Sequence, residues 1–457
     1  GSWFFDGGRL GVSLDGHDSR YGIVAEPDIT IDLQREHLGL AGELARPLPG
    51  LAELRWRANR SVYRHLEIEG DGEVGTTFDS RGSDLRLEVT HLPVGPWRGV
   101  IGLQWEDSTL SALGEEAFVP STHTRKAAIF AMEELAWTGG TSSIGLRLER
   151  ASVDSNGDAD PAEPRFGAPQ QRRFSLRSLA LGHVQPLAPG WSWSANVSAN
   201  ERAPTYFELY ANGLHVATGQ YERGDPTLVV ERGVHVEAGV QWRHGAHRLQ
   251  AQVYGTRFSR FISLEATGDR VDESGAAAPP DADEAWPLLA FRAVRARMHG
   301  LELEAATRLA DRPWTLDASA RLDLTRATNL DTGEALPRIA PARLRLALEA
   351  SQGPWRATVE WDAAARQDRV PATDRATAGY ALLHLGVSRR VRWGEVDALW
   401  FARVQNAGDR LAYSAVSADT VRSLSPLPGR GFSPGLRVKF RATSSGAPPR
   451  HRCAAGA

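Results

Sequence analysis

The sequence predicts an all-β protein, an antiparallel up-and-down transmembrane β-barrel of about 18 strands. Three observations lead to this prediction. Apolar and polar residues alternate over many short segments, short turns alternate with long polar connections, and tryptophans gather near the short turns. Alternation with a period of two places apolar side chains on one face of a strand and polar side chains on the other.

The segment 343–350 shows the alternation in its simplest form. Leu344, Leu346 and Leu348 alternate with charged residues that include Arg343 and Arg345. We expect the leucines to face lipid and the arginines to face a water-filled lumen, because the faces of a membrane barrel are apolar outside and polar inside. The same pattern recurs in residues 234–242, 314–324 and 355–361.

The connections between these segments fall into two kinds that alternate along the chain. Eight short turns rich in Gly and Pro lie near residues 47–50, 93–96, 138–140, 186–190, 244–246, 310–313, 351–354 and 390–394. Nine long polar connections lie near residues 15–28, 69–80, 106–122, 154–171, 201–228, 267–286, 325–338, 366–376 and 406–429. This order puts all the short turns at one end of the strands, as in outer-membrane barrels with short periplasmic turns and long external loops.

Tryptophans near the short turns support the same prediction. They are Trp97, Trp137, Trp191, Trp193, Trp314, Trp355 and Trp393. We expect them to form an interfacial aromatic girdle. The alternative is that they close the ends of a soluble core. Loop asymmetry and strand number favour the membrane barrel, since a soluble barrel of this size would enclose a lumen too wide for side chains to fill.

Composition excludes several other classes of protein. The 457 residues would suggest about three domains, unless one large barrel uses the whole length. No apolar run reaches the length of about 18 residues that a transmembrane helix needs. The net charge of −3 offers no basic surface for nucleic acid, and the single cysteine, Cys453, excludes internal disulfides. No nucleophile elbow or phosphate loop is present, so we expect no enzyme activity.

One segment carries a specific motif. Residues 200–231 resemble the signature segment of TonB-dependent outer-membrane receptors, with Arg-Ala-Pro-x-x-x-Glu-Leu at 202–209 and Asn-Gly-x-His-x-Ala-Thr-Gly at 212–219. Two later segments look like the closing strands of the same family: residues 377–386, and residues 401–440 with their terminal aromatic Phe440.

The resemblance implies a barrel of about 22 strands with a plug domain inside, pulled by the TonB complex. Because Gly1 lies within an expected strand, we expect residues 1–440 to be an N-terminally truncated barrel that lacks the plug. We expect residues 441–457 to be a disordered tail. The implied function is active uptake of a scarce solute across the bacterial outer membrane. The expected partners are membrane lipid, the TonB complex and a small solute, and not nucleic acid.

Residues 21–26, 31–33 and 111–121 resemble the branch of the family that includes zinc-uptake receptors. The resemblance to that branch implies that His215, together with Glu115 or Glu116, binds a metal ion in this chain. Imidazole and carboxylate ligands suit Zn²⁺, which would be the transported ligand and not a cofactor.

Three alternatives remain at this stage. The chain could be a passive porin-like channel or a soluble all-β binding protein, and His215 could be an ordinary loop histidine.

Residues 154–160 alternate oxygen ligands as a calcium loop does, but Ala159 replaces its glycine and Arg165 its terminal glutamate. We therefore expect a solvated acidic external loop there.

Overall fold

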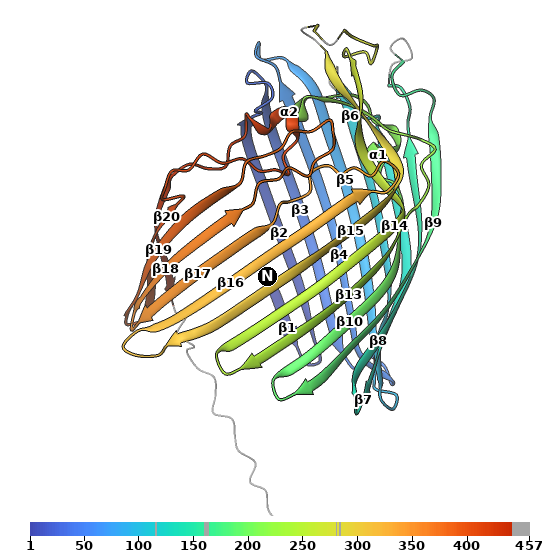
Figure 1. Cartoon of the computed structure of the whole chain (residues 1–457). Coiled ribbons are helices and arrows are strands. Elements are labelled where there is room, and N and C mark those ends of the chain that lie inside the picture. The colour runs from blue at the N-terminus through green and yellow to red at the C-terminus, as the bar shows by residue number, and fades with distance from the viewer. Residues whose placement is uncertain (115–116, 160–163, 280, 283–284, 441–457) are drawn as a thin grey trace, which may run out of the picture.

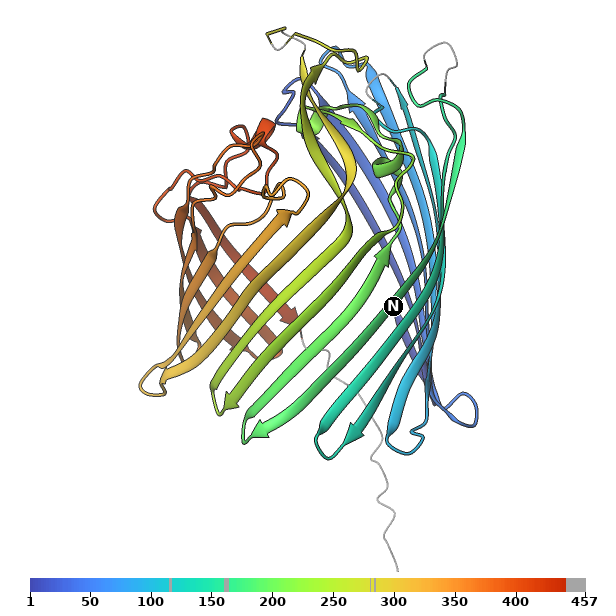
Figure 2. The ribbon, with the colours of Figure 1, turned by 45° about the vertical axis from the view of Figure 1, so that its right-hand side comes forward.

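A single 21-stranded sheet forms the protein and curves into the wall of a barrel (Figures 1 and 2). This computed structural model describes residues 1–114, 117–159, 164–279, 281–282 and 285–440. The all-β prediction is therefore confirmed. The expected tail, residues 441–457, lies outside the described residues.

Eighteen strands of ten or more residues make up the described wall. They are β2 (Gly8–Gly22), β3 (Thr30–Ala45), β4 (Leu51–Ile68), β5 (Val74–His91), β6 (Trp97–Gly114), β7 (Thr122–Trp137), β8 (Gly140–Ser155), β9 (Gln170–Ala188), β10 (Trp191–Arg202), β13 (Glu231–His244), β14 (His247–Val271), β15 (Trp286–Ala310), β16 (Thr315–Asn329), β17 (Arg343–Gln352), β18 (Trp355–Ala364), β19 (Tyr380–Trp393), β20 (Val396–Gln405) and β21 (Gly431–Phe440).

The shorter elements lie at the start of the chain and in two connections. They are the strands β1 (Ser2–Phe5), β11 (Asn212–His215) and β12 (Gln220–Arg223), the helices α1 (Tyr206–Tyr210) and α2 (Asp419–Arg422), and the 3₁₀ turn η1 (Val216–Thr218). Neither helix in the described part of the chain is long and apolar enough to span a membrane.

Each long strand pairs antiparallel with its neighbour along the chain, as the alternation of turns and loops predicts. The wall strand β10 pairs with β13, because β11 and β12 lie within the connection between them. The one parallel ladder in the described residues joins β12 to the external end of β15, with Tyr221 opposite Leu288. The connection after β10 therefore folds back and adds to the wall.

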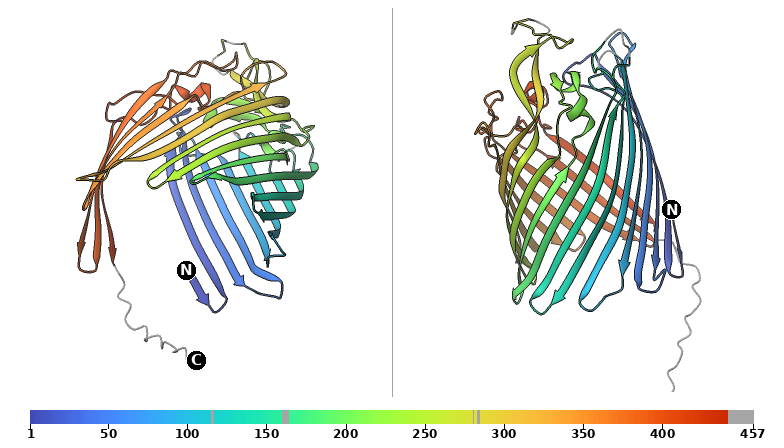
Figure 3. Two further views of the ribbon diagram at one scale, coloured as in Figure 1. Left: turned by 60° about the horizontal axis from the view of Figure 1, so that its bottom comes forward. Right: turned by 90° about the vertical axis from the view of Figure 1, so that its right-hand side faces the viewer.

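The sheet is open in the described chain. Its first strand pairs with β2 and its last with β20, and no ladder joins β1 to β21 among the described residues. The blue and red ends of the sheet stand apart in the left-hand view of Figure 3.

The outer face carries the apolar side of the alternation. Leu346 and Leu348 are 42% and 45% exposed on that face. On the opposite face, Arg345 lies 3.3 Å from an Asp362 carboxylate oxygen. The expected orientation of leucines and arginines agrees with this arrangement. Six of the seven tryptophans near the short turns are also exposed: Trp97, Trp137, Trp191, Trp314, Trp355 and Trp393.

Several strands extend further into the external connections than the sequence suggests. Residues 15–22, for example, were expected within a long connection, yet β2 continues to Gly22 and pairs with β3 along its whole length. Similar extensions occur at the external ends of β5, β6, β14 and β16. Beyond the lipid, both faces of a strand meet water, so the alternation that marks a strand is lost while the backbone ladder continues.

Buried apolar clusters gather at the external ends of the strands. The largest joins the wall to the connection after β10 and includes Val153, Phe174, Leu209, Tyr210 and Phe291. Side chains alone cannot fill a lumen of this width, so a packed core forms where a connection folds against the wall. The candidate site lies in this part of the molecule.

The sidedness of β17 can be tested with neighbouring residues. We expect Leu346→Arg to impair barrel assembly, because a charge on the lipid face costs about 2–4 kcal/mol near the middle of the membrane. Arg345→Leu should be tolerated far better, since Arg343 still pairs with Asp362. Heat-modifiable gel migration measures assembly, and equal effects of the two substitutions would refute the orientation.

Candidate functional site

The signature segment between β10 and β13 folds against the wall at the external mouth. Its path begins at Arg202, passes through α1 and the β11–β12 hairpin, and rejoins the wall at Glu231. Thr205 precedes α1, and its backbone N–H donates to the Glu208 carboxylate at 2.7 Å. This contact satisfies one of the backbone donors that a helix start leaves unpaired. The motif residues therefore fix the local fold.

A charged cluster anchors the segment to the wall. The Arg202 guanidinium donates to both Glu208 carboxylate oxygens, at 2.8 and 3.0 Å. It also donates to Glu231, at 2.9 and 3.2 Å. The Glu208 side chain is 9% exposed, and bidentate pairing with arginine compensates for the cost of burying its charge. The first and seventh residues of the Arg-Ala-Pro-x-x-x-Glu-Leu motif thus contact each other directly.

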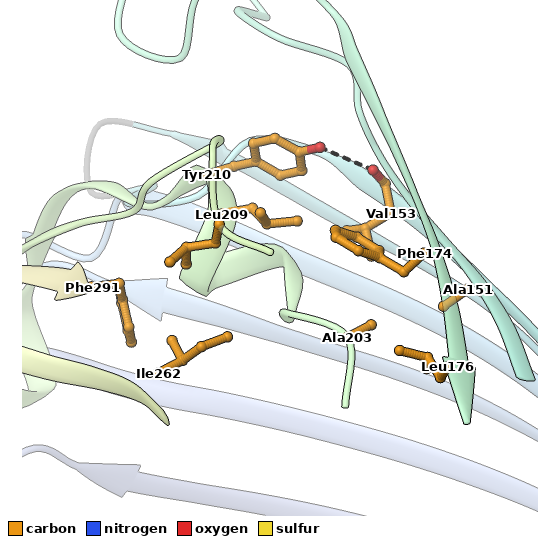
Figure 4. Close-up of a cluster of buried hydrophobic side chains, with 10 residues drawn as sticks. Ala151, Val153, Phe174, Leu176, Ala203, Leu209, Tyr210, Ile262 and Phe291 are labelled. Atoms are coloured by element: carbon orange, nitrogen blue, oxygen red, sulfur yellow. Dashed lines mark hydrogen bonds between the residues drawn. The ribbon is translucent and has the colours of Figure 1, made fainter. Parts of the chain in front are cut away.

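Apolar packing holds α1 in place (Figure 4). Leu209 is completely buried, and the Tyr210 hydroxyl donates to the Val153 carbonyl at 2.9 Å. Burial raises the pKa of Tyr210 to about 12. The hairpin that follows α1 is therefore attached to a rigid support.

His215 lies at the end of β11 in this hairpin. Its Nδ1 is 2.8 Å from the Glu222 carboxylate, and Glu222 is buried. Its ring stacks on Phe118, with ring centroids 4.4 Å apart and planes 9° apart. Phe118 belongs to the connection 115–121 between β6 and β7, whose residues Glu115 and Glu116 lie outside the described residues. The suggested metal role of all three residues therefore stays a prediction.

Sequence reasoning missed Glu222, because residues 201–228 were expected to form one long connection. Within that connection, Gly213 pairs with Glu222, and His215 pairs with Gln220. These two pairs are separated by one pair, so the hairpin places His215 and Glu222 on the same face. A carboxylate that accepts the Nδ1–H proton of histidine leaves the Nε2 lone pair available to a metal ion.

Acidic side chains from separate connections and from the external end of β4 meet at the same mouth. Burial raises the pKa of Glu26, and the negative charges of Glu69, Glu273 and Glu67 raise it further. A group of carboxylates at the entrance makes the local potential negative, which favours the approach of cations.

Contacts between distant connections cover part of the mouth. The Thr420 hydroxyl of α2 donates to the Thr218 carbonyl of η1. The Arg422 guanidinium lies 3.0 Å from Asp374, which joins the last two long connections. The loops around His215 are thereby linked to those at the far end of the chain.

A second group of metal-ligating side chains lies on the inner wall. Glu360, Asp362 and His384 place one ligand atom each within 4.8 Å of one another. They border a lumenal cavity of about 880 Å³. Arg343 and Arg345 both contact Asp362, however, and their positive charges oppose a bound cation. This group therefore acts first as an ion-pair network, and the sequence reasoning had not singled it out.

The calcium-like segment 154–160 starts at the end of β8, and its described carboxylates form contacts within the protein. Asp158 accepts the backbone N–H of Phe166 and the N–H of Arg165 at 2.7 Å, and these bonds lower its pKa. Asp154 lies 2.8 Å from the Arg125 guanidinium. Asp160 lies outside the described residues. The described carboxylates therefore stabilise the loop.

Comparison with protein families gives one match that covers most of the chain. A family model described as "TonB dependent receptor-like, beta-barrel" matches residues 7–407.

Solved structures of similar fold cover nearly the whole chain. A structure described as the copper transporter OprC has a TM-score of 0.78 and 19% identity, with 96% of this chain and 70% of that chain covered. The FrpB iron transporter from Neisseria meningitidis (F3-3 variant) has a TM-score of 0.70 and 13% identity, with 95% and 70% covered. The unliganded ferric citrate transporter FecA has a TM-score of 0.71 and 14% identity, with 95% and 68% covered. At these identities the similarity shows the fold.

The anchoring role of the charged cluster can be tested by Glu208→Gln. The substitution removes the negative charge that accepts two hydrogen bonds from Arg202, and hydrogen bonds to charged groups contribute about 1.5–3 kcal/mol. We therefore expect the Leu209 and Ala211 amides, which donate to Thr205 and Phe207, to exchange with deuterium faster than in the unsubstituted chain. Glu43→Gln removes an exposed partner of Arg9 and serves as the control. Unchanged exchange in Glu208→Gln would contradict the anchoring role.

Proposed function

The chain belongs to the TonB-dependent receptor-like β-barrel family, and from this premise we propose that it takes up a metal ion or metal chelate, with Zn²⁺ bound at His215. Members of this family are transporters of the bacterial outer membrane and not enzymes. An outer-membrane location excludes the alternative of a soluble all-β binding protein. Membership of a receptor family favours active uptake, coupled to the TonB complex, over a passive channel.

The similar structures support a metal cargo. They are described as transporters of copper, iron and ferric citrate. Carboxylates near Glu26 supply the negative potential that a cation would meet at the mouth.

The observation that carries the zinc proposal is the contact between His215 and Glu222. Histidines that bind metals usually donate their other ring N–H to a carboxylate or carbonyl, which fixes the tautomer and the ring orientation. The Glu222 carboxylate is placed for this at 2.8 Å from Nδ1, and the stack on Phe118 restricts rotation of the ring. Glu222 would be a positioning residue and His215 the ligand.

Further ligands would come from the connection 115–121 between β6 and β7. Phe118 brings this connection to His215, and Glu115 and Glu116 precede Phe118 by three and two residues in the sequence. A site that binds Zn²⁺ only for transport needs few protein ligands, because water can complete the tetrahedral coordination of the ion.

Zinc titration of the purified chain in detergent tests this site. The chain's one thiol would also bind zinc, so every variant should carry Cys453→Ser. We expect His215→Ala to abolish the measured binding. Glu222→Gln should weaken it by about 10–100-fold, the usual effect of losing the carboxylate that orients a ligand histidine. Weakening by Glu115→Ala or Glu116→Ala would identify the second ligand.

Two histidines serve as controls for this experiment. His235 contacts Glu237 on β13 at 3.2 Å, away from the connections, and His235→Ala should leave zinc binding unchanged. His384→Ala reports on the group at the inner wall. Loss of binding in His384→Ala with full binding in His215→Ala would overturn the proposed site. Cu²⁺ should bind more tightly than Zn²⁺ at the same ligands, as the usual order of divalent affinities requires.

A further inference from the structure

The outer, lipid-facing surface of the barrel has a depression that extends from β13 to β18. The depression has a volume of about 730 Å³. Its lining residues follow one continuous row of cross-strand partners, which runs through Trp242, Leu249, Ala305, Ala320, Leu346 and Trp361.

Small side chains make the floor of this depression. Ala305 and Ala320 face each other on β15 and β16, and Ala318 lies beside them in the next row. The larger side chains of Trp242 and Trp361 stand at the two ends of the row. The floor is therefore low over two strands and raised on both sides, which gives a trough with apolar walls.

One end of the trough is polar. His247 follows the short turn after β13. Its Nδ1 atom is 2.6 Å from the hydroxyl oxygen of Thr307. Trp242 stacks near His244 and His247, with ring centroids 6.3 and 6.4 Å away. Thr307 pairs with Ala318, so the row that contains His247 and Thr307 continues into the apolar floor. Because barrel strands are tilted, such a row passes from the periplasmic rim into the membrane.

We propose that this trough is a binding site for a phospholipid of the periplasmic leaflet. The trough is continuous with the lipid-facing surface, so lipid is its neighbour in the outer membrane. One acyl chain would lie over Ala305, Ala318 and Ala320. The phosphate would accept a hydrogen bond at the polar end, where the Thr307 hydroxyl would donate to Nδ1 of His247 and leave the Nε2–H of His247 as the donor. The tryptophans at the rim have the amphipathic character that suits the headgroup level.

Native mass spectrometry of the purified, folded chain tests this site with dioleoyl phosphatidylglycerol and dioleoylglycerol as probes. We expect Ala320→Phe to fill the floor and weaken binding of phosphatidylglycerol by about tenfold or more, the effect of losing about two buried methylenes. Ala318→Leu should act in the same direction. The control is Ala238→Phe, which lies on the same face opposite the exposed Val253 and outside the trough.

The polar end is tested separately by His247→Ala. We expect the preference for phosphatidylglycerol over dioleoylglycerol to fall by about tenfold, because the substitution removes a donor to a charged phosphate. Equal binding of phosphatidylglycerol by the unsubstituted chain, Ala320→Phe and Ala238→Phe would overturn the proposal. So would a chain that retains no phospholipid at saturating concentration. An unchanged headgroup preference in His247→Ala would overturn the assignment of the phosphate end.

Discussion

The requirement that every backbone N–H and C=O inside a membrane finds a partner determines this structure. Lipid offers no hydrogen bonds, so only a continuous ladder of strands can cross it with this kind of sequence. The ladder runs from β1 to β21 through the described residues, and its pleat imposes the alternation of faces. Leu346 on one face and Arg345 on the other follow from that single constraint.

The width of the wall has a second consequence, because its lumen cannot be filled by the wall's own side chains. A packed core forms only at the external end, where the connection after β10 folds back. Arg202 and Glu208 fasten this connection, and Leu209 packs beneath it. His215 is held at the mouth as a result, in contact with Phe118 from a connection that lies about a hundred residues earlier in the sequence. The candidate site therefore depends on the same anchor as the external core.

Most of the wall could be predicted from the sequence, because alternation is strict where one face meets lipid. It fails where strands rise beyond the membrane, which is why residues 15–22 were expected in a connection although they belong to β2. The partners of His215 and Asp362 could not be predicted. The contact between His215 and Glu222 depends on a hairpin that forms inside a long connection. Arg343 and Arg345 contact Asp362 only because of the register between β17 and β18. Contacts between connections, such as Thr420 with Thr218, leave no local pattern.

Cysteine accessibility along β17 tests most directly the claim that lipid covers one face and water the other. Single cysteines would replace residues 344 to 349 in a Cys453→Ser chain inserted into lipid vesicles, and each would be treated with a charged maleimide reagent. We expect fast labelling at positions 345, 347 and 349, which face the water-filled lumen, and protection at 344, 346 and 348, which face lipid. Uniform labelling, or labelling of the leucine positions alone, would contradict the membrane orientation on which the rest of the structure depends.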